Sequence, residues 1–146
     1  MSPRAAAETR DQAFDLGTLI ARTRRLVWAS ASRRLEAQGD SMLIWQLLNS
    51  LRRQGPLTQC ELAARTGQHA AGVSRLLDGL ERDGDVVRTR DPRDRRKQVV
   101  ELTQRARRRL EVTDREVAAA SEEVLAPLTA DERKQLKALL SKLLGG

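Results

Sequence analysis

A helix-capping signature followed by a glycine stop constrains the fold of this chain more than any other feature of its sequence. Thr58 precedes Glu61 by three residues, the spacing of a capping box, which predicts a helix over about 58–65. Gly67 then supplies the left-handed stop of that helix, and a second helix is expected over about 68–82. Two short helices joined by so tight a turn predict a helix-turn-helix.

A basic hairpin is predicted directly after the second helix. That helix places four apolar residues on one face (Val73, Leu76, Leu77 and Leu80). Two β-type runs follow, 86–90 and 98–102, separated by the charged loop 91–97. A capped helix, a turn, an amphipathic helix and a hairpin, in this order over residues 57–102, predict a winged helix-turn-helix.

Amphipathic helices are predicted on both sides of this central section. Apolar side chains recur at helical spacing over 12–38 and again from 103 to about 125, and Thr129 with Glu132 forms a second capping box that opens a final helix. The fold class is therefore mainly α with a small β-hairpin wing. The terminal helices carry apolar stripes at opposite ends of the chain, and packing against a second copy would bury them, so we expect a homodimer.

The charge balance indicates a polyanionic partner. Lysine and arginine number 27 against 20 aspartate and glutamate, a formal net charge of +7 in 146 residues. Nucleic acid is the first candidate, since no run approaches the roughly 20 apolar residues needed to span a membrane. The N-terminus also lacks the apolar run of a secretory signal, so we expect a cytoplasmic protein without a membrane partner.

Catalytic and metal chemistry have little support in the sequence. Cys60 and His69 are single residues of their kinds, which excludes an internal disulfide or a cysteine–histidine zinc cluster within one chain. No Gly-rich phosphate loop occurs, and one histidine leaves no evident base for a nucleophile. We expect neither an enzyme nor a bound cofactor or metal.

Two groups of side chains are the candidates for DNA contact. The second helix offers Gln68, His69, Ser74 and Arg75 on its non-core face. Arg75 is the first candidate for a base contact worth about 1–3 kcal/mol of discrimination, although a phosphate contact or a merely solvated helix face would use the same residue type. The hairpin offers Arg88, Arg90, Arg93, Arg95, Arg96 and Lys97 as cations that could meet phosphates or the minor groove, or simply face solvent.

Several segments together resemble the MarR family of transcriptional regulators. They are Gly55-Pro-Leu-Thr, Glu61-Leu-Ala63, Val73-Ser-Arg-Leu76, Leu80-Glu-Arg-Asp-Gly84, Asp91-Pro-Arg-Asp-Arg-Arg96 and Leu102-Thr103. The resemblance implies a single domain over 1–146, with 41–102 as the DNA-binding lobe and 11–38 and 103–146 as dimerisation helices. It also implies that Arg96 enters the minor groove while Asp94 holds it, although Asp91 and Arg93 have the same spacing.

The family likeness further implies a small aromatic or phenolic anion as effector, in a cleft that Arg24 or Arg25 and Trp28 would line. The expected function is a repressor that binds a pseudo-palindromic operator in double-stranded DNA and is released by that ligand. Two alternatives remain: a sequence-neutral architectural nucleic-acid-binding protein, and a redox sensor based on Cys60. Cys60 can equally be a small filler beside the helix start.

Overall fold

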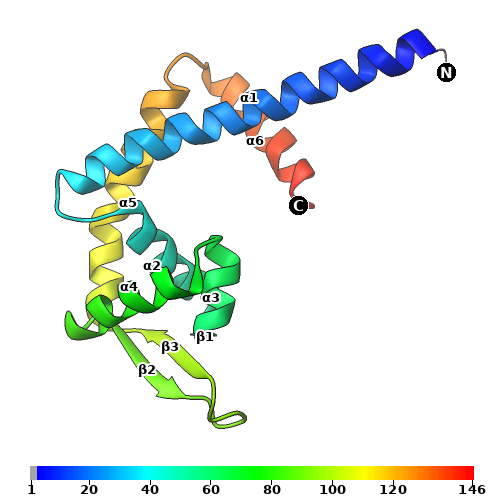
Figure 1. The fold of residues 1–146 in the computed structure, drawn as a ribbon. Coiled ribbons are helices and arrows are strands. Elements are labelled where there is room, and N and C mark those ends of the chain that lie inside the picture. Colours follow the sequence, from blue (N-terminus) through cyan, green and yellow to red (C-terminus); the bar gives the residue numbers. More distant parts are fainter. Residues whose placement is uncertain (1–2) are drawn as a thin grey trace. The chain divides into compact units, whose positions relative to one another are not determined.

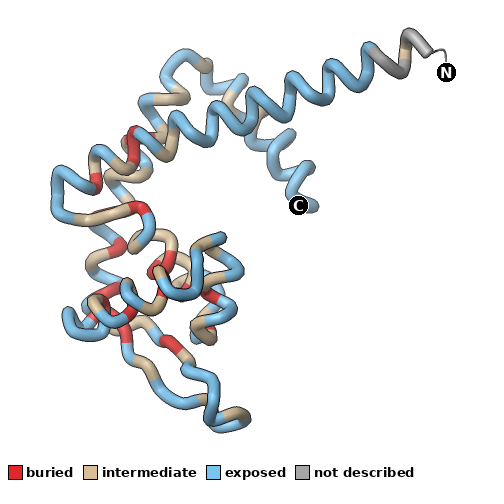
Figure 2. The backbone as a smooth tube through the Cα atoms, viewed as in Figure 1, coloured by how far each residue is buried: buried red, intermediate tan, exposed pale blue. Residues whose placement is uncertain are grey.

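The computed structural model describes residues 3–146, with side chains from residue 8 onward and at Ala5, so the first two residues of the expected domain lie outside the described part. Figure 1 shows the order of the elements, and Figure 2 shows where residues are buried. The elements are α1 (Pro3–Glu36), α2 (Met42–Gln54), β1 (Leu57–Thr58), α3 (Gln59–Thr66), α4 (Ala70–Arg82), β2 (Val86–Arg90), β3 (Gln98–Leu102), α5 (Gln104–Leu125) and α6 (Ala130–Leu143).

The chain divides into two compact units. We call Leu35–Val117 the winged unit, and Met1–Arg34 with Ala118–Gly146 the terminal unit. The winged unit includes more of the chain than the lobe 41–102 expected from the sequence, because the end of α1 and the first part of α5, up to Val117, belong to it. Whether the whole chain is one domain stays a prediction.

The helix boundaries follow from local capping chemistry. In α2, the Ser41 side chain accepts the Ile44 N–H, and in α3 both hydrogen bonds of the Thr58–Glu61 capping box form. Gly67 ends α3 with a φ of 65°, a conformation that strains any residue with a side chain. The predicted helix-turn-helix is confirmed.

Two helix starts differ from the sequence expectation. The first helix begins at Pro3 rather than near residue 12, because its first residues are rich in alanine and charged helix formers, whereas apolar periodicity starts only further along. The second helix of the motif, α4, begins at Ala70 rather than at Gln68. His69 is its N-cap residue, with an extended backbone and no side-chain capping bond.

A three-stranded antiparallel sheet in the order β1-β3-β2 forms the wing and its base. The hairpin pairs Val86 with Leu102 and Arg90 with Gln98, as the two β-type runs predicted. β1 was not predicted; it pairs Leu57 with Val100 and so ties the entry of α3 to the hairpin. Two residues are too few for any alternation to be visible in the sequence.

The main hydrophobic core lies within the winged unit. It is built from α2, α3, α4, the sheet and the start of α5 (Leu47, Leu48, Leu51, Leu57, Leu62, Val73, Leu77, Leu80, Val86, Val100, Ala106 and Leu110). Full burial of a leucine or valine contributes about 1.5–3 kcal/mol, so this cluster fixes the orientation of α4 and the hairpin. α6, in contrast, buries none of its residues within the chain.

Candidate nucleic-acid interface

The face of α4 opposite the core is open to solvent. Val73, Leu77 and Leu80 are buried on one side of the helix, whereas His69 and Arg75 are exposed and Gln68 and Ser74 are half-buried. Arg75 makes a long hydrogen bond from Nε to the Ala71 carbonyl, at 3.5 Å. Gln68 donates from Nε2 to the Leu43 carbonyl, also at 3.5 Å. None of the four predicted residues is buried: Ser74 and Arg75 lie on α4, and Gln68 and His69 directly precede it.

Gly72 lies in the first turn of α4 and has no side chain to cover the surface there. A side-chain carbon added at Gly72 would meet no heavy atom within 4 Å. The helix therefore has room for a residue with a better helix propensity, and the glycine backbone is accessible to a large partner.

The tip of the hairpin presents its cations outward. Arg90, Arg93, Arg95, Arg96 and Lys97 are all exposed. The loop that carries them is closed by two backbone hydrogen bonds of 2.9 Å, from the Asp91 N–H to the Lys97 carbonyl and from the Lys97 N–H to the Asp94 carbonyl. The positions of the loop cations are thus set by an ordered turn.

Asp94 and Arg96 form an ion pair at this tip. Asp94 Oδ1 accepts both the backbone N–H of Arg96 and its Nε–H, each at 3.1 Å, and these bonds lower the pKa of Asp94 below its ordinary value. The Arg96 side chain remains 92% exposed. Asp91, at the alternative spacing, accepts the backbone N–H of Arg93 at 2.8 Å. The Asp94 carboxylate can therefore orient a guanidinium that is otherwise open to a ligand.

Arg88 has a different environment from the other hairpin cations. Its Nη2 donates to Asp78 Oδ1 and to Glu81 Oε2, each at 2.6 Å, and only 15% of its side chain is exposed. The hydrogen bond to Glu81 raises the pKa of Arg88, and the bond to Asp78 raises it further. These two bonds outweigh partial burial, which alone would lower the pKa. Arg88 therefore connects β2 to α4. Neither carboxylate partner was singled out from the sequence, since a salt bridge between a helix and a strand has no fixed spacing.

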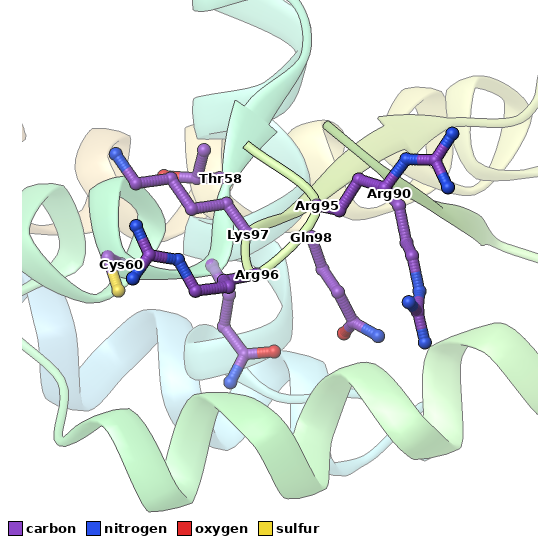
Figure 3. Close-up of a pocket in the computed structure, with 8 residues that line it drawn as sticks. Thr58, Cys60, Arg90, Arg95, Arg96, Lys97 and Gln98 are labelled. Atoms are coloured by element: carbon purple, nitrogen blue, oxygen red, sulfur yellow. The ribbon is translucent and has the colours of Figure 1, made fainter. Parts of the chain in front are cut away.

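A basic pocket separates the hairpin from the start of α3. We call this cavity of about 550 Å³ the wing–α3 pocket; it is lined by Thr58–Cys60 and by Arg90 and Arg95–Gln98. In Figure 3 the Arg96 side chain extends towards the Cys60 thiol. Cys60 is exposed and unbonded to another cysteine. Thr58 was not recognised as a site residue because its role in capping α3 explained it, and nothing in the sequence singled out Gln59.

A buried ion network supports the base of the wing. Asp85, which directly precedes β2, is fully buried, and its Oδ2 accepts from Arg109 Nη1 at 2.5 Å. Arg109 also donates two hydrogen bonds to Asp40, at 2.8 and 3.0 Å. Burial alone would lower the pKa of Arg109, but the bonds to Asp40 and Asp85 outweigh it and raise this pKa. Arg109 of α5 thus binds Asp40 in the loop before α2 and Asp85, the residue that precedes β2.

The predicted effector residues lie on α1, in the terminal unit. The Arg24 guanidinium carbon is 5.6 Å from the centroid of the Trp28 ring, within the range of a cation–π contact. Trp28 is half-buried, and Arg24 and Arg25 are exposed. In the part of the chain that is described, no helix combines the length and hydropathy needed to cross a bilayer.

The helix-turn-helix, its exposed second helix and the basic two-stranded hairpin define a winged helix-turn-helix protein. Comparison with known proteins agrees: residues 44–97 match the model of the MarR family. The chain is 30% identical over 125 residues to the uncharacterized HTH-type transcriptional regulator YwoH of Bacillus subtilis, covering 86% of this chain and 90% of the relative. It is 34% identical over 105 residues to YdgJ of the same species, another such regulator, of which it spans 64%.

Solved structures show the same architecture over most of the chain. MarR from E. coli in its apo form superimposes with a TM-score of 0.82 at 28% identity, covering 88% of this chain and 96% of that one. A MarR variant from E. coli complexed with operator DNA gives a TM-score of 0.72 at 27% identity, covering 92% and 96%. This chain belongs to the MarR family of HTH-type transcriptional regulators. The predicted family, the mainly helical fold with a β wing and long terminal helices, and the non-enzymatic class are confirmed.

Proposed function

We propose that the protein is a repressor that binds a pseudo-palindromic operator in double-stranded DNA as a homodimer. The observation that carries this proposal is the accessible face of α4 beside an ordered, basic hairpin. A similar chain, the MarR variant from E. coli, has been solved complexed with operator DNA, which supports the same use of these elements here. Repression follows if the bound dimer occludes a promoter.

α4 enters the major groove in this proposal. Arg75 is an exposed cation of this helix and reaches base edges, together with Gln68, His69 and Ser74. A bidentate contact from an arginine to guanine O6 and N7 contributes about 1–3 kcal/mol of discrimination. Arg75 is therefore the residue on which sequence preference depends.

Arg96 reads the minor groove from the tip of the hairpin. A narrow A·T-rich groove has an enhanced negative potential that attracts a guanidinium. The pair with Asp94 restricts the Arg96 side chain before binding, which reduces the conformational entropy lost on contact. Arg88 takes no direct part, because its guanidinium is already occupied by two carboxylates of α4.

The terminal unit supplies the dimer interface. Large apolar side chains are exposed along α1 and α6 and at the C-cap of α6 (Phe14, Leu16, Leu19, Ile20, Leu26, Leu139, Leu140, Leu143 and Leu144). Six apolar residues of these two helices line an open groove of about 370 Å³ (Leu16, Leu19, Ile20, Val27, Leu136 and Leu140). Burial of this apolar surface against a second copy favours association and acts against an association cost of about 4–15 kcal/mol. Two-fold symmetry then places two α4 helices about 10–10.5 bp apart, or a multiple of it.

The proposed effector is a small aromatic or phenolic anion. Trp28 offers an aromatic face and Arg24 and Arg25 offer cations on the same helix, which suits such a ligand. A ligand that favours one conformer reduces DNA binding only by its differential affinity for that conformer. Titration of salicylate against a Trp45→Phe variant, whose remaining tryptophan is Trp28, tests this by fluorescence: unchanged emission contradicts the effector role of Trp28.

Binding of the purified protein to the DNA flanking its own gene, and to unrelated DNA, tests the function. We expect a preference of about 10³ or more for the former at fixed salt. Arg75→Ala should reduce that preference, and Arg96→Ala should remove any preference for A·T pairs beneath the wing. Thermal unfolding of both variants controls for folding.

The two alternatives predict different results in this assay. Equal affinity for both DNAs with a steep salt dependence indicates an architectural protein that binds phosphates alone. Binding that is lost under oxidant and preserved in Cys60→Ser indicates a redox sensor.

A further inference from the structure

A second polar pocket lies between the C-terminal halves of α2 and α3. We call this cavity of about 410 Å³ the α2–α3 pocket; it is lined by Asn49, Ser50, Arg53, Gln54 and Arg65. We infer that it docks a carboxylate side chain from an acidic segment of a protein partner. The inference goes beyond the proposed operator binding, because none of the five lining residues belongs to α4 or to the hairpin.

The charge of the α2–α3 pocket favours an anion. Arg53 and Arg65 are exposed, and neither forms an ion pair within the part of the chain that the structure describes. α2 has no acidic residue, and the single acidic residue of α3, Glu61, is bonded to Thr58 in the capping box. The C-terminal ends of the two helices contribute only about −0.5 charge each. The two guanidinium groups outweigh them, so a net charge of about +1 remains for one carboxylate.

Neutral hydrogen-bond donors line the same pocket. Asn49 Oδ1 accepts from Arg52 Nη2 at 2.6 Å, and Arg52 is itself held by Asp114, with 2.6 Å between Nη1 and Oδ2. Because its carbonyl oxygen is engaged in this way, the Asn49 amide offers a ligand its Nδ2 group, which only donates. Ser50 and Gln54 add a hydroxyl group and a second amide. A carboxylate accepts hydrogen bonds from all of these groups, and it can accept two from one arginine.

A side chain of a protein partner suits this pocket better than a free small molecule or DNA. Arg53, Gln54 and Arg65 are exposed, so the pocket covers little of a small ligand, whereas small-molecule sites bury about 70–90% of the ligand surface. A carboxylate that belongs to a partner chain gains further contacts from the surfaces of α2 and α3 around the pocket. DNA is proposed to contact α4 and the hairpin, so an acidic protein segment has a separate surface that is available while DNA is bound.

NMR of the arginine side chains tests the docking surface directly. The ¹⁵N-labelled full chain is titrated, alone and with a saturating DNA duplex that occupies the basic DNA-binding surface. The probe is a short peptide of alternating aspartate and glutamate, blocked at both ends, and the control peptide has asparagine and glutamine in their place. We expect the acidic peptide to shift the Nε–Hε signals of Arg53 and Arg65 with and without the duplex, and the control peptide to shift neither. Arg53→Lys and Arg65→Lys assign the two signals.

Variants of the lining residues test the contribution of each group. Arg53→Gln and Arg65→Gln should each weaken binding of the acidic peptide about two- to fivefold, the range for an exposed ion pair. Ser50→Asp places a carboxylate of the chain itself in the pocket and should also weaken peptide binding. Arg107→Gln is the matched control: Arg107 is an exposed arginine of α5 that does not line the pocket, and its loss should leave the affinity unchanged. Thermal unfolding of each variant confirms that it is folded.

The outcomes separate this inference from the proposed function. Unshifted Arg53 and Arg65 signals, or equal peptide affinity in Arg53→Gln, Arg65→Gln and Arg107→Gln, overturn the docking surface even if the protein selects its operator. Loss of the shifts when the duplex is added overturns it and assigns the pocket to DNA. Acetate that shifts both signals at the same concentration as the peptide also overturns it and assigns the pocket to a free anion. Shifts by the acidic peptide in a protein without operator preference support the docking surface and contradict only the sequence-specific repressor.

Discussion

Arg88 of β2 donates a hydrogen bond of 2.6 Å to Asp78 of α4, and a second of the same length to Glu81 one turn further along that helix. The helix proposed to read bases and the strand that leads to the wing tip are therefore held together by one guanidinium. Their relative orientation depends on an ion network as well as on the apolar core.

Arg88→Ala should weaken operator binding even if, as proposed, Arg88 does not contact the DNA itself. We expect a loss of about 1 kcal/mol in the free energy of unfolding, since both carboxylates are more than 40% exposed and therefore screened. Operator affinity should fall, while the salt slope stays the same. Arg90→Ala, a control on the same strand, should change stability by less than about 0.5 kcal/mol and reduce the slope. A reduced slope in Arg88→Ala would show that Arg88 contacts phosphate after all.

Arg109 and Arg105 both approach Asp85, but they should contribute unequally to stability. Arg109→Gln removes the main partner of a fully buried carboxylate and should cost about 3 kcal/mol in urea unfolding. Arg105 is 66% exposed and 3.4 Å from Asp85, so Arg105→Gln should cost less than about 1 kcal/mol. Equal losses in the two variants would contradict a dominant role for Arg109.

Asp114 should make stability depend on pH in the acid range. Burial alone would raise its pKa, but hydrogen bonds from Arg52 (2.6 Å) and Trp45 (2.9 Å) outweigh it and lower the pKa below its ordinary value. A group with a lowered folded pKa contributes stability above its unfolded value of about 3.9, and loses it as pH falls through the folded value.

The measurement compares wild type with Asp114→Asn by denaturant unfolding across pH. We expect a difference of about 1 kcal/mol at neutral pH, discounted because Asp114 is partly exposed, and a progressive decrease below about pH 4. In a Trp28→Phe background, Trp45 emission should change over the same acid range. A difference that is constant between pH 7 and pH 3 would argue against this assignment.

Ile20→Glu should dissociate the proposed dimer. Ile20 is 49% exposed on α1 and lines the apolar groove, so a buried charge there would be unpaired in the complex. Sedimentation velocity should show a monomer, with operator affinity reduced because the two half-sites are no longer linked. Arg22→Glu, an exposed change on the same helix, should leave the dimer intact. A wild-type monomer at micromolar concentration would refute the dimer itself.

Gly72→Ala should stabilise the protein and weaken its binding to DNA. The added methyl group meets no atom within 4 Å, so the gain in helix propensity of up to about 1 kcal/mol should be realised. The same methyl group stands on the face of α4 that approaches the groove, and affinity should decrease. Unchanged affinity with increased stability would show that Gly72 does not approach the DNA.

The helix-turn-helix could be predicted because its signals are local. Thr58, Glu61 and Gly67 act through hydrogen bonds and backbone angles within a few residues, and those interactions are the same in any fold. The hairpin was predictable for a similar reason, since two β-type runs flank a short polar loop. The predicted start of α1 was wrong because apolar periodicity indicates a buried helix face and gives little signal for an exposed helix.

Only the tertiary structure determines which residues far apart in the sequence contact each other. The sequence grouped Arg88 with the other cations of the hairpin, whereas in the structure Arg88 pairs with Asp78 and Glu81. Sequence spacing also does not indicate that Arg109 bonds to Asp85, 24 residues away. Charged side chains are long and pair in many ways, so their partners depend on how the core orients the elements. Local capping and turn chemistry thus determined which elements form, whereas packing decided which cations hold the fold together and which remain exposed to a ligand.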